Sequence, residues 1–166
     1  MRGLARAIAT FGYVGLLPGP SGTLGSAAAI PVAYLLHWAG GFPLLLLATG
    51  AVYALGHWAV SVELRGREDE DPGEIVIDEV AGQWIALWPL SAGLWLAGAA
   101  PQVFPWPGWV GAFLAFRLFD IVKRGPVGWA DRLGGARGVM LDDAIAGCLA
   151  ALVVTLLAAI AHGWLA

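Results

Sequence analysis

The sequence has few charged residues for its length. Only 13% of its 166 residues are charged, against roughly 25% in a typical soluble domain. Hydrophobic residues make up 59% of the chain, more than a soluble core of this size could bury. The composition therefore favours an integral membrane protein, and the alternative is a very apolar soluble bundle or an obligate oligomer. The length predicts a single domain over residues 1–166.

Other absences exclude whole classes of function. A single cysteine, Cys148, rules out an intramolecular disulfide, and no Cys-x5-Arg pattern offers a phosphatase thiolate. We expect Cys148 to be a small core hydrophobe. No basic patch with interleaved aromatic residues supports nucleic-acid binding. The histidines lie far from the acidic pairs along the chain, which disfavours phosphotransfer through histidine: His37, His57 and His162.

Charge is also missing from every second connection between the apolar runs. Three connections carry no Lys, Arg, Asp or Glu: Gly40–Gly41, residues 99–108 and residues 161–166. All nine basic and twelve acidic residues fall in the other segments: residues 2–6, 63–79 and 117–143. Because hydrocarbon penalises charge, this sorting predicts that all the ionisable chemistry faces water and head groups at one side of a membrane. We expect the acidic run within residues 65–74 to be a solvated loop.

The apolar runs predict an all-α integral membrane bundle with about five embedded helices. A spanning helix needs about 20 apolar residues. The runs that approach this length are Leu24–Trp38, Phe42–Val62, Ile75–Ala99, Trp109–Val122 and Val139–Leu165. Pro31 is tolerable as a kink, and Gly40–Gly41 predicts a tight uncharged turn.

The first 17 residues predict a short interfacial helix. Two arginines before an apolar stretch are also typical of a signal peptide, but the chain continues into a glycine-rich motif and another apolar run. We therefore expect the segment to lie along the interface, with Leu4, Ile8 and Phe11 dipping inward. Basic residues cluster in the connections on the N-terminal side, which predicts that this side is cytoplasmic.

Two acidic pairs are each followed by a glycine one helical turn later. Asp78–Glu79 precedes Gly82, and Asp142–Asp143 precedes Gly147. Small residues let helix backbones approach closely in a membrane, so we expect two helices to touch at these glycines and bring four carboxyl groups into one pocket. Oxygen ligands of this kind suit Mg²⁺ shared with phosphate. The alternative is helix N-terminal capping, which either pair alone would favour.

A third group of polar residues ends the fourth apolar run. Arg117 and Asp120 share a helical face, and Lys123 follows one turn beyond. Arg117 offers a planar fork for phosphate and Lys123 a mobile charge, whereas a helix-end salt bridge with a lysine reaching the interface is the alternative. Asp120 could join the metal site or orient Arg117. Asp131 could close the site or pair with a neighbouring arginine, Arg132 or Arg137.

The segment from Pro18 to Ser26 opens the first long helix. Its glycines permit a backbone nest, and a helix N-terminus directs N–H groups at an anion. Ser21, Gly22, Thr23 and Ser26 are the candidate phosphate contacts. No lysine follows, so this is not a Walker motif. A turn capped by Ser or Thr is the simpler interpretation of this pattern taken alone.

Three blocks, taken in order, resemble the phosphatidylglycerophosphatase A family of bacterial membrane phosphatases. Residues 22–26 (Gly-Thr-Leu-Gly-Ser) resemble its Pro-Gly-Thr-x-Gly-Ser block, and residues 75–82 its Ile-Val-x-Asp-Glu-x-x-Gly block. Residues 116–147, from Phe116-Arg117 through Asp131 to Asp142-Asp143 and Gly147, resemble the third. Two prolines of the family pattern are replaced, by Ser21 and Arg124, and neither change removes a charged candidate.

The resemblance implies Mg²⁺-dependent hydrolysis of phosphatidylglycerophosphate to phosphatidylglycerol and phosphate, at the bacterial cytoplasmic (inner) membrane. We expect a water activated by the metal to attack in line, with a covalent aspartyl-phosphate as the rival mechanism. The predicted catalytic residues are Asp78, Glu79, Asp120, Lys123, Asp142 and Asp143. The predicted metal ligands are Asp78, Glu79, Asp142 and Asp143. The predicted substrate contacts are Ser21, Gly22, Thr23, Ser26, Arg117 and Asp131.

Two other functions stay open at this point. One is action on a different membrane lipid phosphate, such as a polyprenyl diphosphate. The other is ion or proton transport through buried carboxylates, which expects acids at mid-membrane depth. The acidic pairs are instead expected at helix starts, which favours the phosphatase. The sequence leaves the oligomeric state open.

Overall fold

The computed structural model describes residues 2–67, 72–161 and 163, and all regular structure in these residues is helical. The elements are α1 (Arg2–Ala9), the 3-10 turn η1 (Val14–Leu16), α2 (Ser21–Glu63), α3 (Ile77–Leu96), α4 (Trp106–Val122), α5 (Pro126–Asp131) and α6 (Gly135–Ala161). The all-α prediction is therefore confirmed for this part of the chain. Most of the expected acidic loop (residues 68–71) and His162 lie outside the described residues.

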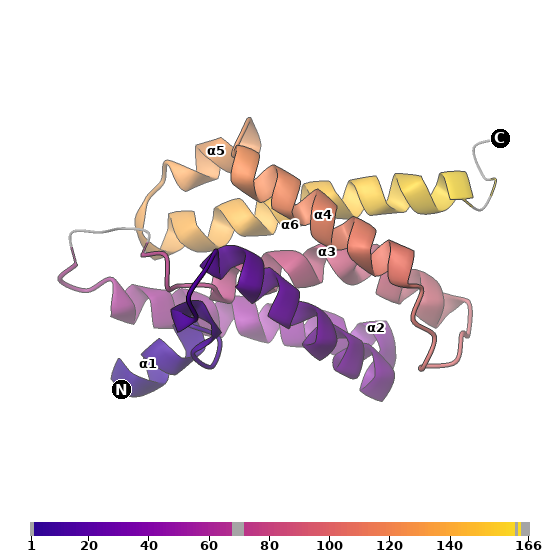
Figure 1. Ribbon diagram of the computed structural model, residues 1–166, viewed down its shortest axis with the longest axis horizontal. Coiled ribbons are helices and arrows are strands. Elements are labelled where there is room, and N and C mark those ends of the chain that lie inside the picture. Colours follow the sequence, from indigo (N-terminus) through magenta and orange to yellow (C-terminus); the bar gives the residue numbers. More distant parts are fainter. Residues whose placement is uncertain (1, 68–71, 162, 164–166) are drawn as a thin grey trace.

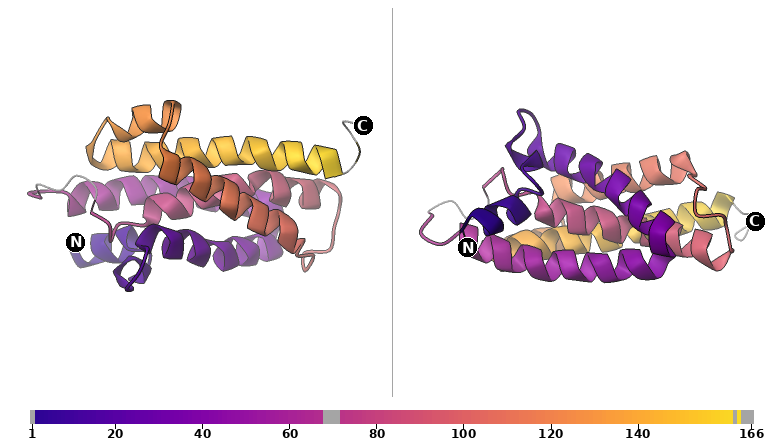
Figure 2. Two further views of the ribbon diagram at one scale, coloured as in Figure 1. Left: turned by 45° about the horizontal axis from the view of Figure 1, so that its top comes forward. Right: turned by 90° about the horizontal axis from the view of Figure 1, so that it is seen from below.

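Helix α2 is a hairpin of two antiparallel helical arms (Figures 1 and 2). The backbone leaves the helical conformation at Gly40 (φ −155°, ψ 17°) and Gly41 (φ 64°, ψ −159°). The positive φ of Gly41 is costly for a residue with a Cβ, and a Cβ there would also collide with Trp95 of α3. The arms, residues 21–39 and 42–63, correspond to the two helices expected on either side of a glycine turn.

Helix α3 lies at the centre of the bundle and packs against α2, α4 and α6. Its indole groups tie it to both arms of the hairpin. Nε1 of Trp84 donates a hydrogen bond to the carbonyl oxygen of Ala29 (2.9 Å), and Nε1 of Trp88 donates one to Oγ1 of Thr49 (3.2 Å). The middle of α3 is thereby hydrogen-bonded to both arms of α2.

The two ends of the bundle differ in charge. The N-terminus, the connection from α2 to α3, α5 and the start of α6 lie together at one end (Figure 1). The tip of α2, the connection from α3 to α4 and the C-terminal end of α6 lie at the other. Among the described residues, those with charged side chains belong to the first set of segments and the helical turns beside them. This arrangement agrees with the predicted sorting of charge to one side, and the first set is called the charged end below.

Two helices among the described residues are long and apolar enough to cross a membrane, rather than the five expected. They are α2 and α6, with mean hydropathies of 1.6 and 2.6 over their most apolar windows. Helix α4 has 17 residues, short of the length that a span needs. Helix α3 has 20 residues, but its first two turns contain Asp78, Glu79 and Gln83, and most of their neighbours are buried inside the bundle.

Three further expectations are corrected at the level of single elements. Helix α6 begins at Gly135 and not at Val139, so Asp142 and Asp143 lie two turns inside it and not at its start. Between the expected helices Trp109–Val122 and Val139–Leu165, where no helix was expected, residues 126–131 form the short helix α5. Cys148 is exposed on the outer side of α6 and is not a core residue, because the face of α6 that packs on α3 passes through Gly147.

Helix α1 lies along the hairpin at the charged end. Ala5 and Ala9 are fully buried, and α1 packs against α2. Ile8 and Phe11 contact the core, as expected, whereas Leu4 points away and is 62% exposed. The backbone N–H of Val76 donates to the carbonyl oxygen of Ala9 (2.9 Å), which joins the end of α1 to the residue just before α3.

Candidate active site

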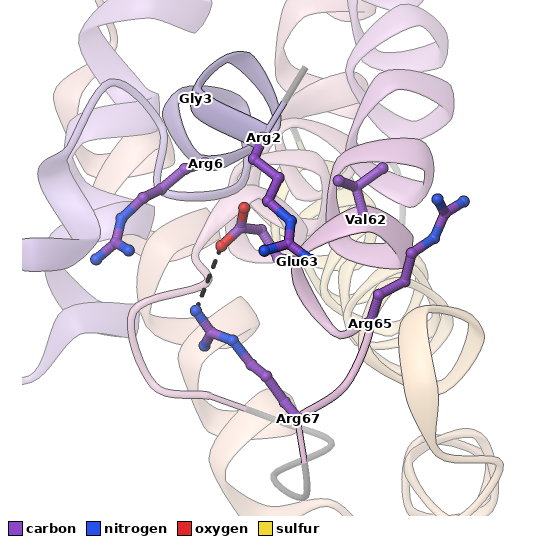
Figure 3. Close-up of a pocket in the computed structure, with 7 residues that line it drawn as sticks. All are labelled: Arg2, Gly3, Arg6, Val62, Glu63, Arg65 and Arg67. Atoms are coloured by element: carbon purple, nitrogen blue, oxygen red, sulfur yellow. Dashed lines mark hydrogen bonds and ion pairs between the residues drawn. The ribbon is translucent and has the colours of Figure 1, made fainter.

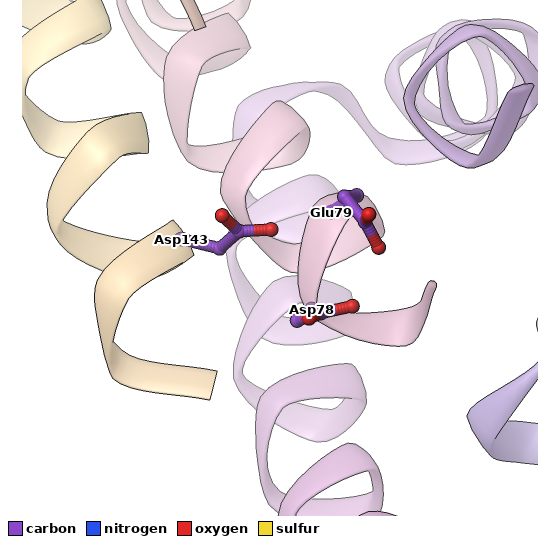
Figure 4. A group of neighbouring side chains, drawn as sticks. All are labelled: Asp78, Glu79 and Asp143. Carbon is purple, nitrogen blue, oxygen red and sulfur yellow. The ribbon is translucent and has the colours of Figure 1, made fainter. Parts of the chain in front are cut away.

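Carboxylates from α3 and α6 meet in a buried group at the charged end. Asp78 and Glu79 occupy the first turn of α3, and Asp143 reaches toward them from α6 (Figure 4). One oxygen from each of the three side chains lies within 4.8 Å of the others. Asp78 is 7% exposed and Asp143 only 2%. Negative charges this close repel one another where little water can screen them, so the group requires protons or a cation.

Two glycines allow α3 and α6 to approach closely enough to form this group. A Cβ built on Gly82 would lie 2.6 Å from the carbonyl oxygen of Asp143 and 2.5 Å from a ring carbon of Phe116. A Cβ on Gly147 would overlap the carbonyl oxygen of Gly82. The predicted contact between the two helices at these glycines is therefore present. Of the four acids expected in one pocket, it brings together Asp78, Glu79 and Asp143.

The fourth acid, Asp142, is bound by Lys123 instead. Nζ of Lys123 lies 2.8 Å from Oδ2 of Asp142 and 2.5 Å from Oδ1 of Asp131. Lys123 ends α4 in the left-handed conformation (φ 46°, ψ 43°), which turns the chain toward α5. Oδ1 of Asp142 accepts a hydrogen bond from the backbone N–H of Asp143 (2.9 Å). Lys123 thus links α4, α5 and α6, and Asp131 pairs with it and not with a neighbouring arginine.

The two aspartates keep the Lys123 ammonium charged. Burial alone would lower the pKa of Lys123, but its hydrogen bonds to Asp131 and Asp142 outweigh burial and raise the pKa well above the usual value for lysine. A lysine that is merely extended to the interface would lack these partners. Two carboxylates already share its charge, so Lys123 is a weaker candidate for direct phosphate binding than its sequence position indicates.

The guanidinium of Arg117 lies where α2, α3 and α4 meet. Nη1 is 2.5 Å from Oδ2 of Asp120 and donates a longer hydrogen bond to Oγ of Ser26 (3.4 Å). A Cβ on Gly22 would lie 3.2 Å from both Nη1 and Nη2 and would clash with Oε1 of Glu79. The missing side chain at Gly22 therefore leaves the space in which Glu79 and Arg117 come together. Asp120 orients Arg117, the second of its two predicted roles.

The glycine-rich segment forms the first turn of α2. The residue before it, Pro20, has an extended backbone and makes no side-chain capping bond, so the capped turn is not formed there. Oγ of Ser26 donates to the carbonyl oxygen of Gly22 (2.7 Å). Ser21 and Thr23 are partly buried beside them. The first N–H groups of α2 lie at the edge of the site, and a helix start leaves such groups without intrahelical acceptors.

Gln83 is a polar residue of this region that the sequence analysis missed. Its side chain is fully buried, and within the described chain neither amide atom has a hydrogen-bond partner. It lies one turn along α3 from Glu79, between Gly82, which faces α4, and Trp84, which faces α2. By helical spacing, Gln83 shares a face of α3 with Glu79. The available signal was one glutamine within an otherwise apolar run.

The carboxylate group is suited to a small hard cation. Its donors are all oxygen, the ligand type that Mg²⁺ prefers. Oε2 of Glu79 is buried and has no hydrogen-bond partner among the described residues. Asp120 and Asp142 also repel Asp143 electrostatically, which adds to the negative charge around it. Asp78, Glu79 and Asp143 are thus the residues that could hold such an ion.

Comparisons with known proteins show which family the chain resembles. The family model of phosphatidylglycerophosphatase A matches residues 7–158. Phosphatidylglycerophosphatase A of Escherichia coli strain K12 is 34% identical over 152 residues, covering 90% of this chain and 79% of that protein. The Haemophilus influenzae protein of the same name is 31% identical over 141 residues (84% and 80%).

A third relative carries a different name. A putative phosphatidylinositol-3-phosphatase of Bacteroides thetaiotaomicron is 36% identical over 138 residues, covering 80% of each chain. No solved structure matches the chain. With a family model that covers nearly all of its length and relatives above 30% identity, the chain belongs to the phosphatidylglycerophosphatase A family.

Proposed function

We propose that this chain hydrolyses the terminal phosphate of phosphatidylglycerophosphate and releases phosphatidylglycerol and inorganic phosphate. The observation that carries the proposal is the buried group of Asp78, Glu79 and Asp143 beside the Arg117 guanidinium. Negative oxygens that can hold a cation, next to a fixed cation that can hold phosphate, form the pairing that phosphoryl transfer requires. The names of the two phosphatidylglycerophosphatase relatives support the choice of lipid.

Mg²⁺ is proposed as the cofactor. Asp78, Glu79 and Asp143 would hold it, and Asp142, which the sequence placed with them, would act on this group through Lys123 and Asp143. When bound, the ion would supply positive charge for the phosphate oxygens and make a neighbouring water more acidic.

The chain's own contribution begins with Arg117. Its planar fork can donate two parallel hydrogen bonds to phosphate, and the bond to Asp120 fixes its orientation. The absence of a Cβ at Gly22 lets the Arg117 guanidinium lie against the first turn of α2, where a phosphate would meet both. The hydroxyl of Ser26 and the first N–H groups of α2 border the same place, with Ser21 and Thr23 as further contacts.

Lys123 and Gln83 are assigned supporting roles. Lys123 holds Asp131 and Asp142, and so keeps α5 and the acidic turn of α6 in position beside α4. The amide of Gln83 would hydrogen-bond a polar atom of the bound lipid or a water, because leaving both amide atoms unpaired in a buried place is costly.

Hydrolysis is proposed to proceed by attack of water on phosphorus. The water oxygen forms the new P–O bond, the bond to the glycerol oxygen breaks, and that oxygen leaves with the electron pair and gains a proton. A carboxylate of the site takes the proton from water. The rival is attack by an aspartate, which would leave a protein-bound acyl phosphate. Stopping turnover of phosphorus-labelled substrate and finding a hydroxylamine-sensitive label on the protein would establish the rival.

Substrate choice is tested with the purified protein in detergent micelles. Release of phosphate is measured from phosphatidylglycerophosphate, from phosphatidylinositol 3-phosphate and from a polyprenyl diphosphate, each with and without Mg²⁺. We expect the first lipid to react fastest. A preference for the inositol lipid would instead support the activity in the Bacteroides relative's name. Ion flux in liposomes without phosphate release from any lipid would support a transporter.

We further propose that the chain crosses the bacterial inner membrane several times, with its charged end in the cytoplasm. The apolar arms of α2 and α6 support spanning, and the clustering of basic residues supports the orientation. Single cysteines introduced at Arg124 and at Gln102, in a Cys148→Ala background, test this with an impermeant maleimide on intact spheroplasts. The label should reach Q102C and not R124C. The opposite pattern would reverse the orientation.

A further inference from the structure

A second polar cavity lies at the charged end, apart from the carboxylate group. It has a volume of about 330 Å³. Figure 3 shows the side chains of α1, the end of α2 and the following turn around it. Four arginines and one glutamate supply its charged lining: Arg2, Arg6, Arg65, Arg67 and Glu63. Such a concentration of guanidinium groups is unusual in a chain with only nine basic residues.

The charge of this arginine cavity is positive when the described residues are counted. Arg67 bonds Oε2 of Glu63 (3.3 Å) and Oε1 of Glu74 (2.8 Å). The hydrogen bond from Arg67 lowers the pKa of Glu74, which keeps that carboxylate ionised. For the other three arginines, no carboxylate in the described part of the chain lies within ion-pair distance. Within the described residues their charge is available to an anion, and the guanidinium fork matches phosphate.

Exposed leucines lie in the same N-terminal part of the chain as Arg2 and Arg6, outside the cavity lining. Leu4, on the helix that carries Arg2 and Arg6, is 62% exposed, and Leu17 beyond α1 is 53% exposed. Neither leucine belongs to the buried core or packs against it. Exposed leucine beside arginine is the composition of a segment that lies at the head-group level of a bilayer.

We propose that the arginine cavity binds the phosphate of an anionic phospholipid as a second lipid site, separate from the site of hydrolysis. Arg2, Arg6 and Arg65 would contact the phosphate, and the acyl chains would extend from the cavity into the bilayer. The carboxylates that the cavity contacts are paired with Arg67 and are not grouped to hold a cation, so a lipid bound there is not hydrolysed. This binding does not depend on the proposed reaction.

The helix that carries Arg2 and Arg6 is joined to the start of α3 by one backbone hydrogen bond. The end of α1 accepts the hydrogen bond from Val76, which directly precedes the turn that carries Asp78 and Glu79. A lipid that steadies α1 would also steady this turn. Turnover is therefore expected to rise when anionic lipid is added to a neutral bilayer.

Binding is measured on the detergent-purified protein by the change in tryptophan fluorescence, in metal-free buffer. The probes are short-chain phosphatidylserine, short-chain phosphatidylcholine and inorganic phosphate. Arg2→Gln/Arg65→Gln should weaken phosphatidylserine binding about 25-fold, because each arginine near a lipid surface contributes about fivefold. Arg2→Lys/Arg65→Lys should recover most of the affinity. Arg137→Gln, an exposed arginine outside the cavity, is the matched control and should bind as the parent does.

Three outcomes would overturn the proposal. Equal phosphatidylserine binding by the parent and the double glutamine variant would show that the cavity is not the site. Equal binding of phosphatidylserine and phosphatidylcholine would show that the cavity does not recognise the negative charge of the lipid. Inorganic phosphate that binds as tightly as phosphatidylserine would assign the cavity to the free anion and not to a lipid. Should the double variant unfold, Arg2→Gln alone is measured, with about a fivefold loss expected.

Discussion

Gly147 of α6 packs directly on Gly82 of α3, so closely that a Cβ on Gly147 would overlap the Gly82 carbonyl oxygen. The contact lies one turn beyond Asp78 and Asp143. The separation of the two helices therefore sets the separation of the carboxylates. Catalytic geometry and helix packing depend on the same two residues, and substitutions at this contact test both.

Gly147→Ala should destabilise the protein by about 1–3 kcal/mol, as overpacked cores do. It should also lower phosphate release, because the acidic turns are pushed apart. Thermal unfolding followed by tryptophan fluorescence and an activity assay measure the two effects. Gly111→Ala in α4 is the matched control, since a Cβ there meets nothing within 4 Å. A Gly147→Ala variant as stable and active as Gly111→Ala would contradict the packing.

Asp78→Asn and Asp143→Asn should each lower Mg²⁺-dependent phosphate release by about 100-fold or more, comparable to losing one preorganised catalytic group. Both variants should remain folded, because removing one of three crowded negative charges relieves repulsion. The rate as a function of Mg²⁺ concentration, together with circular dichroism, checks this. Near-normal rates in both variants would remove these carboxylates from the mechanism.

Asp142→Asn should shift the Mg²⁺ dependence less than Asp143→Asn does. Its side chain is engaged by Lys123 and lies outside the group that one ion could bridge. Its main effect is expected on stability. The half-saturating Mg²⁺ concentrations of the two variants are compared to test whether Asp142 binds the ion. A larger shift for Asp142→Asn than for Asp143→Asn would indicate that Asp142 is a ligand.

Lys123→Met should destabilise the protein by about 3–5 kcal/mol, because it leaves the buried carboxylate of Asp142 without its cation. The side chain of Asp142 is only 4% exposed, whereas that of Asp131 is 40% exposed. Asp131→Asn should therefore cost about 0–1 kcal/mol, as exposed ion pairs do. Denaturation of both variants in the same detergent gives the comparison. Equal losses would show that Lys123 does not serve mainly to neutralise Asp142.

Arg117→Ala should reduce turnover by about 100-fold with the fold intact. Arg117→Lys should recover only part of the rate, since lysine lacks the planar fork that Asp120 aligns. Initial rates and thermal unfolding are compared for both. An Arg117→Ala variant that fails to fold, while Arg117→Lys is fully active, would indicate a structural charge in place of a phosphate contact.

Much of the fold could be predicted from composition, because the hydrocarbon of a membrane favours apolar segments and disfavours charged ones, and both are visible in the local sequence. Apolar length and the absence of charge in alternate connections were enough to predict the long helical segments and the charged end, but not the short helix α5. The beginning of α6 was not predicted, since Gly135 and Gly138 resemble helix breakers and only the packing of α5 on α6 makes helix favourable there. The number of spanning helices was overestimated because a helix packed inside the bundle can be as apolar as one that faces lipid.

Four acids were predicted in one pocket and three are found there, and helix geometry explains why Asp142 is not among them. Adjacent helical residues point about 100° apart, so Asp142 and Asp143 cannot both face α3. Asp143 is four residues before Gly147 and shares its face, whereas Asp142 turns toward Lys123. The four-residue spacing from Asp143 to Gly147 in the sequence was therefore enough to predict which of the two aspartates faces α3. The pairing of Lys123 with Asp131 and the burial of Gln83 depend on how α3, α4 and α5 meet, which no local pattern encodes.

The hairpin of α2 has a consequence for how the protein enters a membrane. Both of its free ends lie at the charged end, and its tip at Gly40–Gly41 carries no ionisable side chain. The two arms can therefore insert together, tip first, without dragging an ion through the lipid tails. Arginine placed at the tip should slow this insertion during synthesis, even though the finished bundle would leave that position at the opposite surface.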